Sequence, residues 1–115
     1  MRIADTSLVL DRRQLRDVSL DDDELMRDLL DTLLEDAARQ MSQIERAIRE
    51  RDPDRCRRLA HYVKGACANL GANAAVAVLR RMEVEAGAQA FDQCAASLAT
   101  LGNELERLRV EANSL

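Results

Sequence analysis

The sequence has 115 residues, of which 47% are hydrophobic and 2% aromatic, and its formal net charge at pH 7 is −4. The negative charge and the scarcity of aromatic rings argue against nucleic-acid binding, which uses a broad basic surface or rings that stack on bases. The length suits one domain with one hydrophobic core, and a single proline with only four glycines favours an all-helical protein.

The composition also bears on location and on metal binding. No apolar run approaches the roughly 20 residues that span a membrane, and no secretory signal follows Met1. Cys56, Cys67 and Cys94 are widely spaced and include no C-x-x-C pair, which indicates buried thiols in a reducing compartment rather than a disulfide framework or a zinc site. We therefore expect a cytoplasmic protein with no direct membrane contact and no metal or cofactor of its own.

The first helix is predicted to be short. Residues 1–7 are expected to form a loose N-terminus, followed by a helix over residues 8–17. Leu10, Leu15 and Val18 are predicted to face inward from it.

Ser19 and the acidic run at residues 21–24 mark the start of a longer helix. A serine that can cap, followed by acids in the first turn, is a typical helix start. The acidic run lacks the ligand spacing and the central glycine of a calcium loop. The helix is predicted over about residues 22–51, with apolar side chains at helical intervals: Leu25, Leu29, Leu30, Leu33, Leu34, Ala37, Met41, Ile44 and Ile48.

The third helix has clear signals at both ends. Asp52 as N-cap and Pro53 at the first helical position predict its start, and Gly71 after Leu70 predicts a left-handed residue that closes it.

Two further helices complete the predicted fold. Asn73 can cap a fourth helix that ends at Gly87, with Val76, Leu79 and Met82 facing inward. The fifth helix carries a stripe of Phe91, Cys94, Leu98, Leu101, Leu105 and Leu108. Short connections favour antiparallel neighbours, so we predict an all-α protein, an antiparallel four-helix bundle with a short additional N-terminal helix. We expect residues 1–115 to be a single monomeric domain.

The third helix contains the only histidine, His61. At about 100° per residue, Cys56, Leu59, Val63, Ala66 and Leu70 form its core-facing stripe. His61 points to nearly the opposite side, together with Arg57, Lys64, Gly65 and Ala68. The pattern predicts an exposed imidazole among basic and small residues.

Gly65 and Lys64 indicate what the imidazole could bind. A glycine inside a helix costs roughly 1 kcal/mol relative to alanine, so an outward glycine beside His61 suggests that open space is needed there. Lys64, one turn from His61, can direct an ammonium group to the same space. A ring nitrogen, a cation and an uncovered backbone together suit a phosphoryl group.

These residues resemble the histidine-containing phosphotransfer (HPt) domain family. The family pattern places lysine three, glycine four and a second glycine ten positions after the histidine, and here these are His61, Lys64, Gly65 and Gly71. The two residues after the first glycine are Ala66 and Cys67 rather than the usual serines, and both are small. Together with the helix spacing, the resemblance covers nearly the whole chain.

The resemblance implies a function and a set of partners. HPt domains accept a phosphoryl group on histidine from a receiver-domain aspartate of a response regulator and pass it to another such aspartate. His61 would then be the phospho-acceptor, with Lys64 as the cation beside the phosphoryl group and Gly65 as the gap for the partner. The partners would be response-regulator receiver domains, a hybrid sensor histidine kinase, or both. Mg²⁺ would belong to the receiver only.

Three further residues are candidates for supporting roles. Glu83 matches a family position that hydrogen-bonds the histidine, and Arg80 matches a second polar position facing it. Both could equally be solvated surface charge. Arg57 and Arg58 join Lys64 in a basic patch that would complement an acidic receiver site.

Two other classes of protein stay open on the residues alone. One is the phospho-acceptor helix pair of a sensor histidine kinase, which usually has an acidic residue after the histidine, whereas Tyr62 follows His61 here. The other is a helical adaptor with an inert histidine. The sequence has no glycine-rich nucleotide loop, so we expect no ATP-dependent kinase activity.

Overall fold

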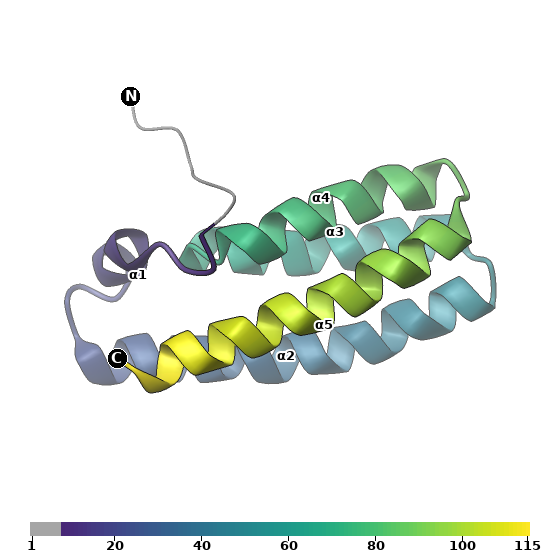
Figure 1. The fold of residues 1–115 in the computed structure, drawn as a ribbon. Helices are drawn as coiled ribbons and strands as arrows, with labels where there is room; N and C mark the ends of the chain where they lie inside the picture. The colour runs from purple at the N-terminus through teal and green to yellow at the C-terminus, as the bar shows by residue number, and fades with distance from the viewer. Residues whose placement is uncertain (1–7) are drawn as a thin grey trace, which may run out of the picture.

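A computed structural model describes residues 8–115, which form an antiparallel four-helix bundle with a short helix at one end (Figure 1). In chain order the helices are α1 (Arg12–Val18), α2 (Asp23–Arg49), α3 (Pro53–Leu70), α4 (Asn73–Gly87) and α5 (Phe91–Asn113). Consecutive long helices are joined by short turns and pack against each other. The last of them, α5, also packs against α2, which closes the bundle. The predicted fold class is therefore confirmed. The predicted loose segment, residues 1–7, lies outside the described range.

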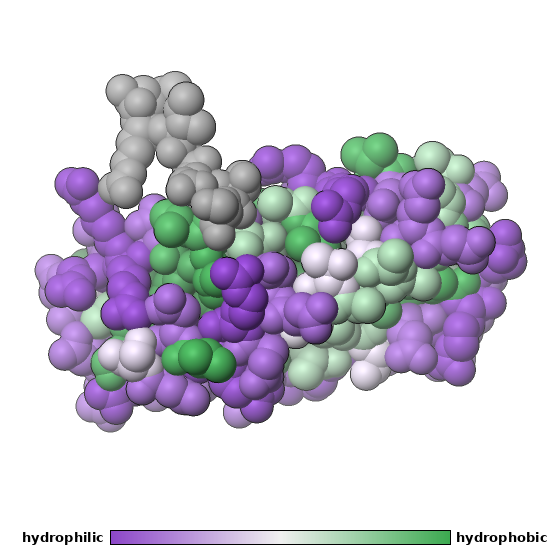
Figure 2. Space-filling view, viewed as in Figure 1, coloured by the Kyte–Doolittle hydropathy of each residue, from purple (hydrophilic) through white to green (hydrophobic). Residues whose placement is uncertain are grey.

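The core is built mainly from the predicted apolar stripes, although Leu25, predicted on the apolar stripe of α2, is 38% exposed near the start of that helix. Leu30 and Ile44 of α2, Leu79 of α4 and Leu101 of α5 contribute fully buried side chains, and α3 contributes Val63 at 1% exposure. The three cysteines are free and buried, as predicted for thiols that act as small hydrophobic side chains. Figure 2 shows hydrophilic residues over most of the face seen there, with apolar residues in separate small areas. None of the described helices is both long and apolar enough to cross a membrane.

The predicted start of α2 near residue 22 lies within one residue of the observed start, but the predicted capping of this helix by Ser19 is wrong. Asp22 caps this helix, with its carboxylate accepting a hydrogen bond from the Leu25 backbone N–H at 3.1 Å. Ser19 instead follows α1, where its buried hydroxyl donates to the Leu15 carbonyl at 2.8 Å. The chain reverses between the two helices through positive φ angles at residues 20 and 21, which places Ser19 away from the start of α2.

The extent and orientation of α1 also differ from prediction. The helix begins at Arg12 rather than at residue 8, because Asp11 caps it by accepting from the N–H groups of Arg13 and Gln14. Val18, predicted to face inward, is 40% exposed at the helix end. Leu15 is fully buried, as predicted.

The predicted cap of α4 by Asn73 is also wrong. Asn73 is the first residue of the helix, and Ala72 stands at the N-cap position without a side-chain hydrogen bond. The segment of residues 8–11 supplies a partner instead, because the Leu8 carbonyl accepts from the Ala74 N–H at 2.8 Å. A backbone carbonyl from a distant part of the chain therefore satisfies one of the free N–H groups at the start of α4, which the Asn73 side chain was predicted to do.

Gly71 joins this N-terminal segment to the bundle. Its φ is +81°, the left-handed conformation predicted for the residue that closes α3. Its carbonyl accepts from the Asp11 N–H at 2.8 Å, and a Cβ added at Gly71 would lie 2.9 Å from the Asp11 carbonyl oxygen. Both the backbone conformation and the close approach of residues 8–11 require glycine here.

Candidate functional site

The position of His61 follows from how α3 begins and which face it buries. Asp52 caps the helix by accepting from the Arg55 N–H at 3.1 Å, and Pro53 is its first residue, as predicted. The buried residues Cys56, Ala60, Val63 and Cys67 fix one face of α3 in the core. His61 lies on the outer face, with its side chain 71% exposed.

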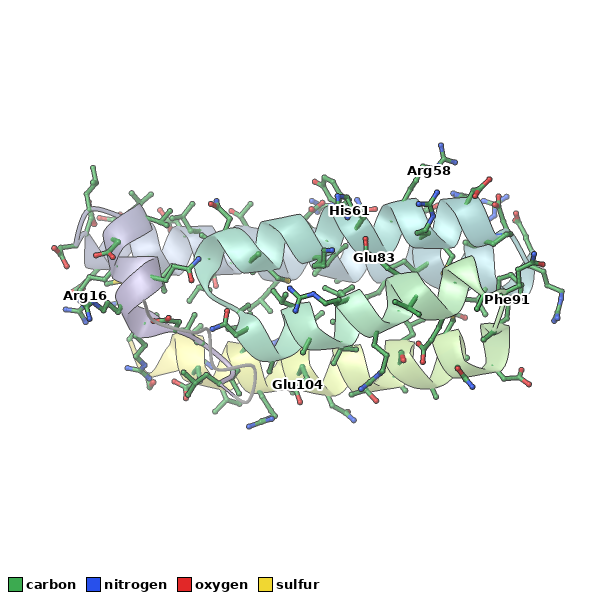
Figure 3. All side chains as sticks on the ribbon, turned by 90° about the horizontal axis from the view of Figure 1, so that it is seen from above. Arg16, Arg58, His61, Glu83, Phe91 and Glu104 are labelled. Atoms are coloured by element: carbon green, nitrogen blue, oxygen red, sulfur yellow. The ribbon has the colours of Figure 1, made fainter. Side chains whose placement is uncertain are left out.

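Glu83 of α4 holds both His61 and Lys64. Its Oε1 lies 2.6 Å from Nδ1 of His61, and its Oε2 accepts from Nζ of Lys64 at 2.5 Å. Leu79, Met82 and Ala86 are buried on the same helix, which leaves Glu83 at the seam between α3 and α4 with its side chain 16% exposed. Figure 3 shows His61 and Glu83 on these neighbouring helices.

This arrangement determines the charge on Glu83 and the tautomer of His61. Partial burial acts to raise the pKa of Glu83, but the hydrogen bonds from Lys64 and His61 outweigh it and hold that pKa below its ordinary value. The carboxylate is therefore ionised at neutral pH and accepts a hydrogen bond from the N–H at Nδ1 of His61. The lone pair then resides on Nε2, which is the nitrogen free to act as a nucleophile.

A hollow of about 230 Å³ lies beside the imidazole, lined by Arg57, Arg58, His61 and Glu83. Nη2 of Arg57 is 3.9 Å from a carboxylate oxygen of Asp54, whereas Nε of Arg58 donates to the Asp54 backbone carbonyl at 3.4 Å. The hollow is thus bordered by the nucleophile, one carboxylate and two guanidinium groups.

Space is also open on the other side of His61 along α3. A Cβ added at Gly65 would meet nothing within 4 Å, beyond its own helix backbone and chain neighbours. Because helical side chains lean toward the N-terminus of their helix, a side chain at this position would extend over His61. The glycine keeps that approach uncovered.

A second groove, between α2 and α3, flanks the site. It is lined by Leu29, Thr32, Leu33, Asp36, Arg39, Tyr62, Ala66, Asn69 and Leu70. The Tyr62 hydroxyl donates to Oδ2 of Asp36 at 2.9 Å, which fixes the orientation of a ring that is 54% exposed. His61 therefore stands between two hollows, one toward α4 that is lined by charged residues and His61, and one toward α2 that includes several apolar residues.

The structure brings together most of the residues singled out from the sequence. Lys64 and Glu83 join His61 in one hydrogen-bonded group, and Arg57 lines the adjoining hollow. Arg80 is exposed and makes no hydrogen bond or ion pair within residues 8–115. Arg58, named in the sequence only as part of a basic patch, lines the same hollow as His61. The sequence could have placed Arg58 beside His61, because it lies three residues before His61 and residues three apart share a helix face.

Comparison with known proteins gives one family and two similar structures. Residues 28–111 match the family model of the Hpt domain. The crystal structure of histidine-containing phosphotransfer protein B from Pseudomonas aeruginosa PAO1 superposes with a TM-score of 0.83 at 23% identity, covering 92% of each chain.

An X-ray structure of a putative histidine-containing phosphotransfer protein from rice also has a TM-score of 0.83, at 18% identity, covering 95% of this chain and 80% of that one. At these identities the two structures establish the fold alone. No match was found among curated proteins.

Proposed function

The chain belongs to the Hpt domain family of histidine phosphotransfer proteins of phosphorelays, and from this premise we propose that His61 is its phospho-accepting residue. The observation that carries the proposal is the 2.6 Å contact between Nδ1 of His61 and Oε1 of an ionised Glu83. It leaves Nε2 unprotonated, exposed and beside open space. His61 is also the only histidine in the chain.

The proposed transfer is an in-line displacement at phosphorus. Nε2 of His61 attacks the phosphoryl group of a receiver's phospho-aspartate, the N–P bond forms, and the O–P bond breaks to release the aspartate as a carboxylate. The Nδ1 proton stays on the ring, so the phosphorylated imidazole carries a positive charge. Glu83 faces that charge directly, which stabilises the phosphohistidine as a carboxylate stabilises a catalytic imidazolium. Return of the group to another receiver aspartate reverses these steps.

Lys64 has a role in this proposal through its contact with Glu83. Its ammonium group donates to Oε2 of Glu83 at 2.5 Å, so in the unphosphorylated chain it compensates the charge of that carboxylate and orients it. Gly65 keeps the approach to Nε2 open for the partner's acidic pocket. The partners we propose are receiver domains of response regulators, of a hybrid sensor histidine kinase, or of both, with Mg²⁺ bound by the receiver.

The docking face follows from the position of His61. A receiver that brings its aspartate to Nε2 must cover the neighbouring surface of α3, including the exposed ring of Tyr62 and the groove toward α2. The guanidinium groups of Arg57 and Arg58 would meet the acidic side of such a partner and steer its approach.

Phosphotransfer from purified receivers tests the proposal. The wild-type chain is mixed with receivers phosphorylated by a small-molecule donor, and label on the chain is tested for acid lability. We expect acid-labile label on the wild type and none on His61→Gln, which should fold normally because the side chain is exposed. Binding of receivers without transfer of label would instead identify the chain as an adaptor with an inert histidine.

A further inference from the structure

The phosphorylated site would carry more negative charge than Lys64 alone can balance. A phosphoryl group on Nε2 carries up to two negative charges and is placed next to ionised Glu83. Lys64 is already hydrogen-bonded to Glu83, and its side chain leans back along α3 toward that carboxylate. One ammonium group cannot balance both the carboxylate and a doubly charged phosphoryl group, so a second cation beside Nε2 would stabilise the phosphorylated chain.

The hollow beside His61 contains the residue that can provide this charge. The ring of His61 leans toward the N-terminus of α3, over the turn that carries Arg57 and Arg58, and all three residues line the hollow with Glu83. Figure 3 shows Arg58 beside His61 on α3 and Glu83 on the adjacent helix. We propose that Arg58 binds the phosphoryl group on His61, an assignment that rests on the phospho-acceptor role of His61 proposed above.

Arg58 is better suited to this role than the other arginines near the site. Arg57 is paired with the Asp54 carboxylate at 3.9 Å, whereas Arg58 has no carboxylate within ion-pair distance in the part of the chain that the structure describes. Arg80 lies on α4 and does not line the hollow. The planar guanidinium of Arg58 presents two parallel N–H donors, a geometry that matches two oxygens of a phosphoryl group.

The assignment can be tested without knowing the natural partner. Phosphoramidate serves as a small-molecule donor: Nε2 of His61 attacks its phosphorus, the P–N bond of the donor breaks, and ammonia leaves. The phosphorus resonance of the phosphorylated full-length chain is then followed by ³¹P NMR through the second ionisation of the phosphoryl group. A bound guanidinium favours the doubly charged form, so Arg58→Ala should raise the proton affinity of the phosphoryl group by about three- to tenfold at low salt.

Two variants separate a specific contact from a general loss of charge. Arg55→Ala removes the same charge from the same helix, but the Arg55 guanidinium donates to Gln43 of α2 at 2.5 Å and does not line the hollow. We expect this variant to behave as wild type. Arg58→Lys keeps the positive charge but loses the two parallel N–H donors. The proton affinity of its phosphoryl group should lie between those of wild type and Arg58→Ala. The Nε resonance of Arg58, but not that of Arg55, should shift when the chain is phosphorylated.

Equal proton affinities in Arg58→Ala and Arg55→Ala, or an Arg58 resonance that does not move, would overturn the assignment of Arg58 while leaving His61 as phospho-acceptor. Failure of the wild-type chain to be phosphorylated on His61 would overturn the assignment together with its premise. Arg58 is exposed on α3, so its removal should leave the helical circular dichroism spectrum unchanged.

Discussion

Replacing Glu83 by glutamine tests the central contact of the site. The amide keeps the shape of the side chain, but Nδ1 of His61 and Nζ of Lys64 face different carboxylate oxygens, and one of these becomes an NH2 group that cannot accept from a donor. A hydrogen bond to a charged group is worth about 1.5–3 kcal/mol when buried. Because the His61 side chain is 71% exposed, solvent reduces this to about 1 kcal/mol, equivalent to about a fivefold change in the ratio of the two imidazole tautomers.

The single histidine makes the assay direct. Long-range ¹H–¹⁵N spectra of the unphosphorylated chain report the tautomer of His61 without overlap from other imidazoles. In wild type we expect the proton on Nδ1, and in Glu83→Gln a shift toward the Nε2-protonated form, with phosphotransfer slowed by about fivefold. Glu85→Gln is the matched control, since Glu85 lies on the same helix but accepts from Ser97 instead. Nitrogen shifts that are identical in wild type and Glu83→Gln would refute the orienting role of Glu83.

Other substitutions and reagents test the rest of the site and its support. Gly65→Gln should gain up to about 1 kcal/mol in stability toward urea yet slow phosphotransfer at least tenfold, with Gly65→Ala intermediate; unchanged kinetics would remove the reason given for this glycine. Gly71→Ala should lose about 2–4 kcal/mol in urea unfolding, because the left-handed φ and the 2.9 Å approach of the Asp11 carbonyl both penalise a Cβ; a loss below about 1 kcal/mol would contradict this. Burial raises the pKa of Cys56 and of Cys67 to about 12, so both thiols should resist a thiol reagent at neutral pH until the chain unfolds, and rapid labelling of the folded chain would count against their burial.

Features that depend on residues close in sequence could be predicted well. The face of α3 that carries His61 follows from helical periodicity, and Asp52, Pro53 and Gly71 define the ends of that helix through their own backbone preferences. The outward position of Gly65 follows from the same periodicity. These properties are set within a few turns of one helix.

Features that depend on contacts between distant segments could not be predicted in the same way. The shared carboxylate of Glu83 requires the axial alignment of α3 and α4, which the sequence of either helix does not specify. Asn73 is not the cap because α4 begins one residue earlier than predicted, with Ala72 at the N-cap position, and the Leu8 carbonyl, far away in sequence, accepts from the Ala74 N–H. Ser19 does not cap α2 because the chain reverses at residues 20 and 21, between Ser19 and the helix. Asp22, which lies after this reversal, caps it instead.

The attachment of residues 8–11 to the α3–α4 turn also has a consequence for the order of folding. Its backbone hydrogen bonds close loops of roughly sixty residues, whereas the contact of His61 with Glu83 spans 22 positions within one helical hairpin. Because long loops cost more chain entropy, the α3–α4 hairpin can form early and the N-terminal segment must dock late. In the native state the same segment should be the first to open, and its opening would leave the phosphotransfer residues assembled on their hairpin.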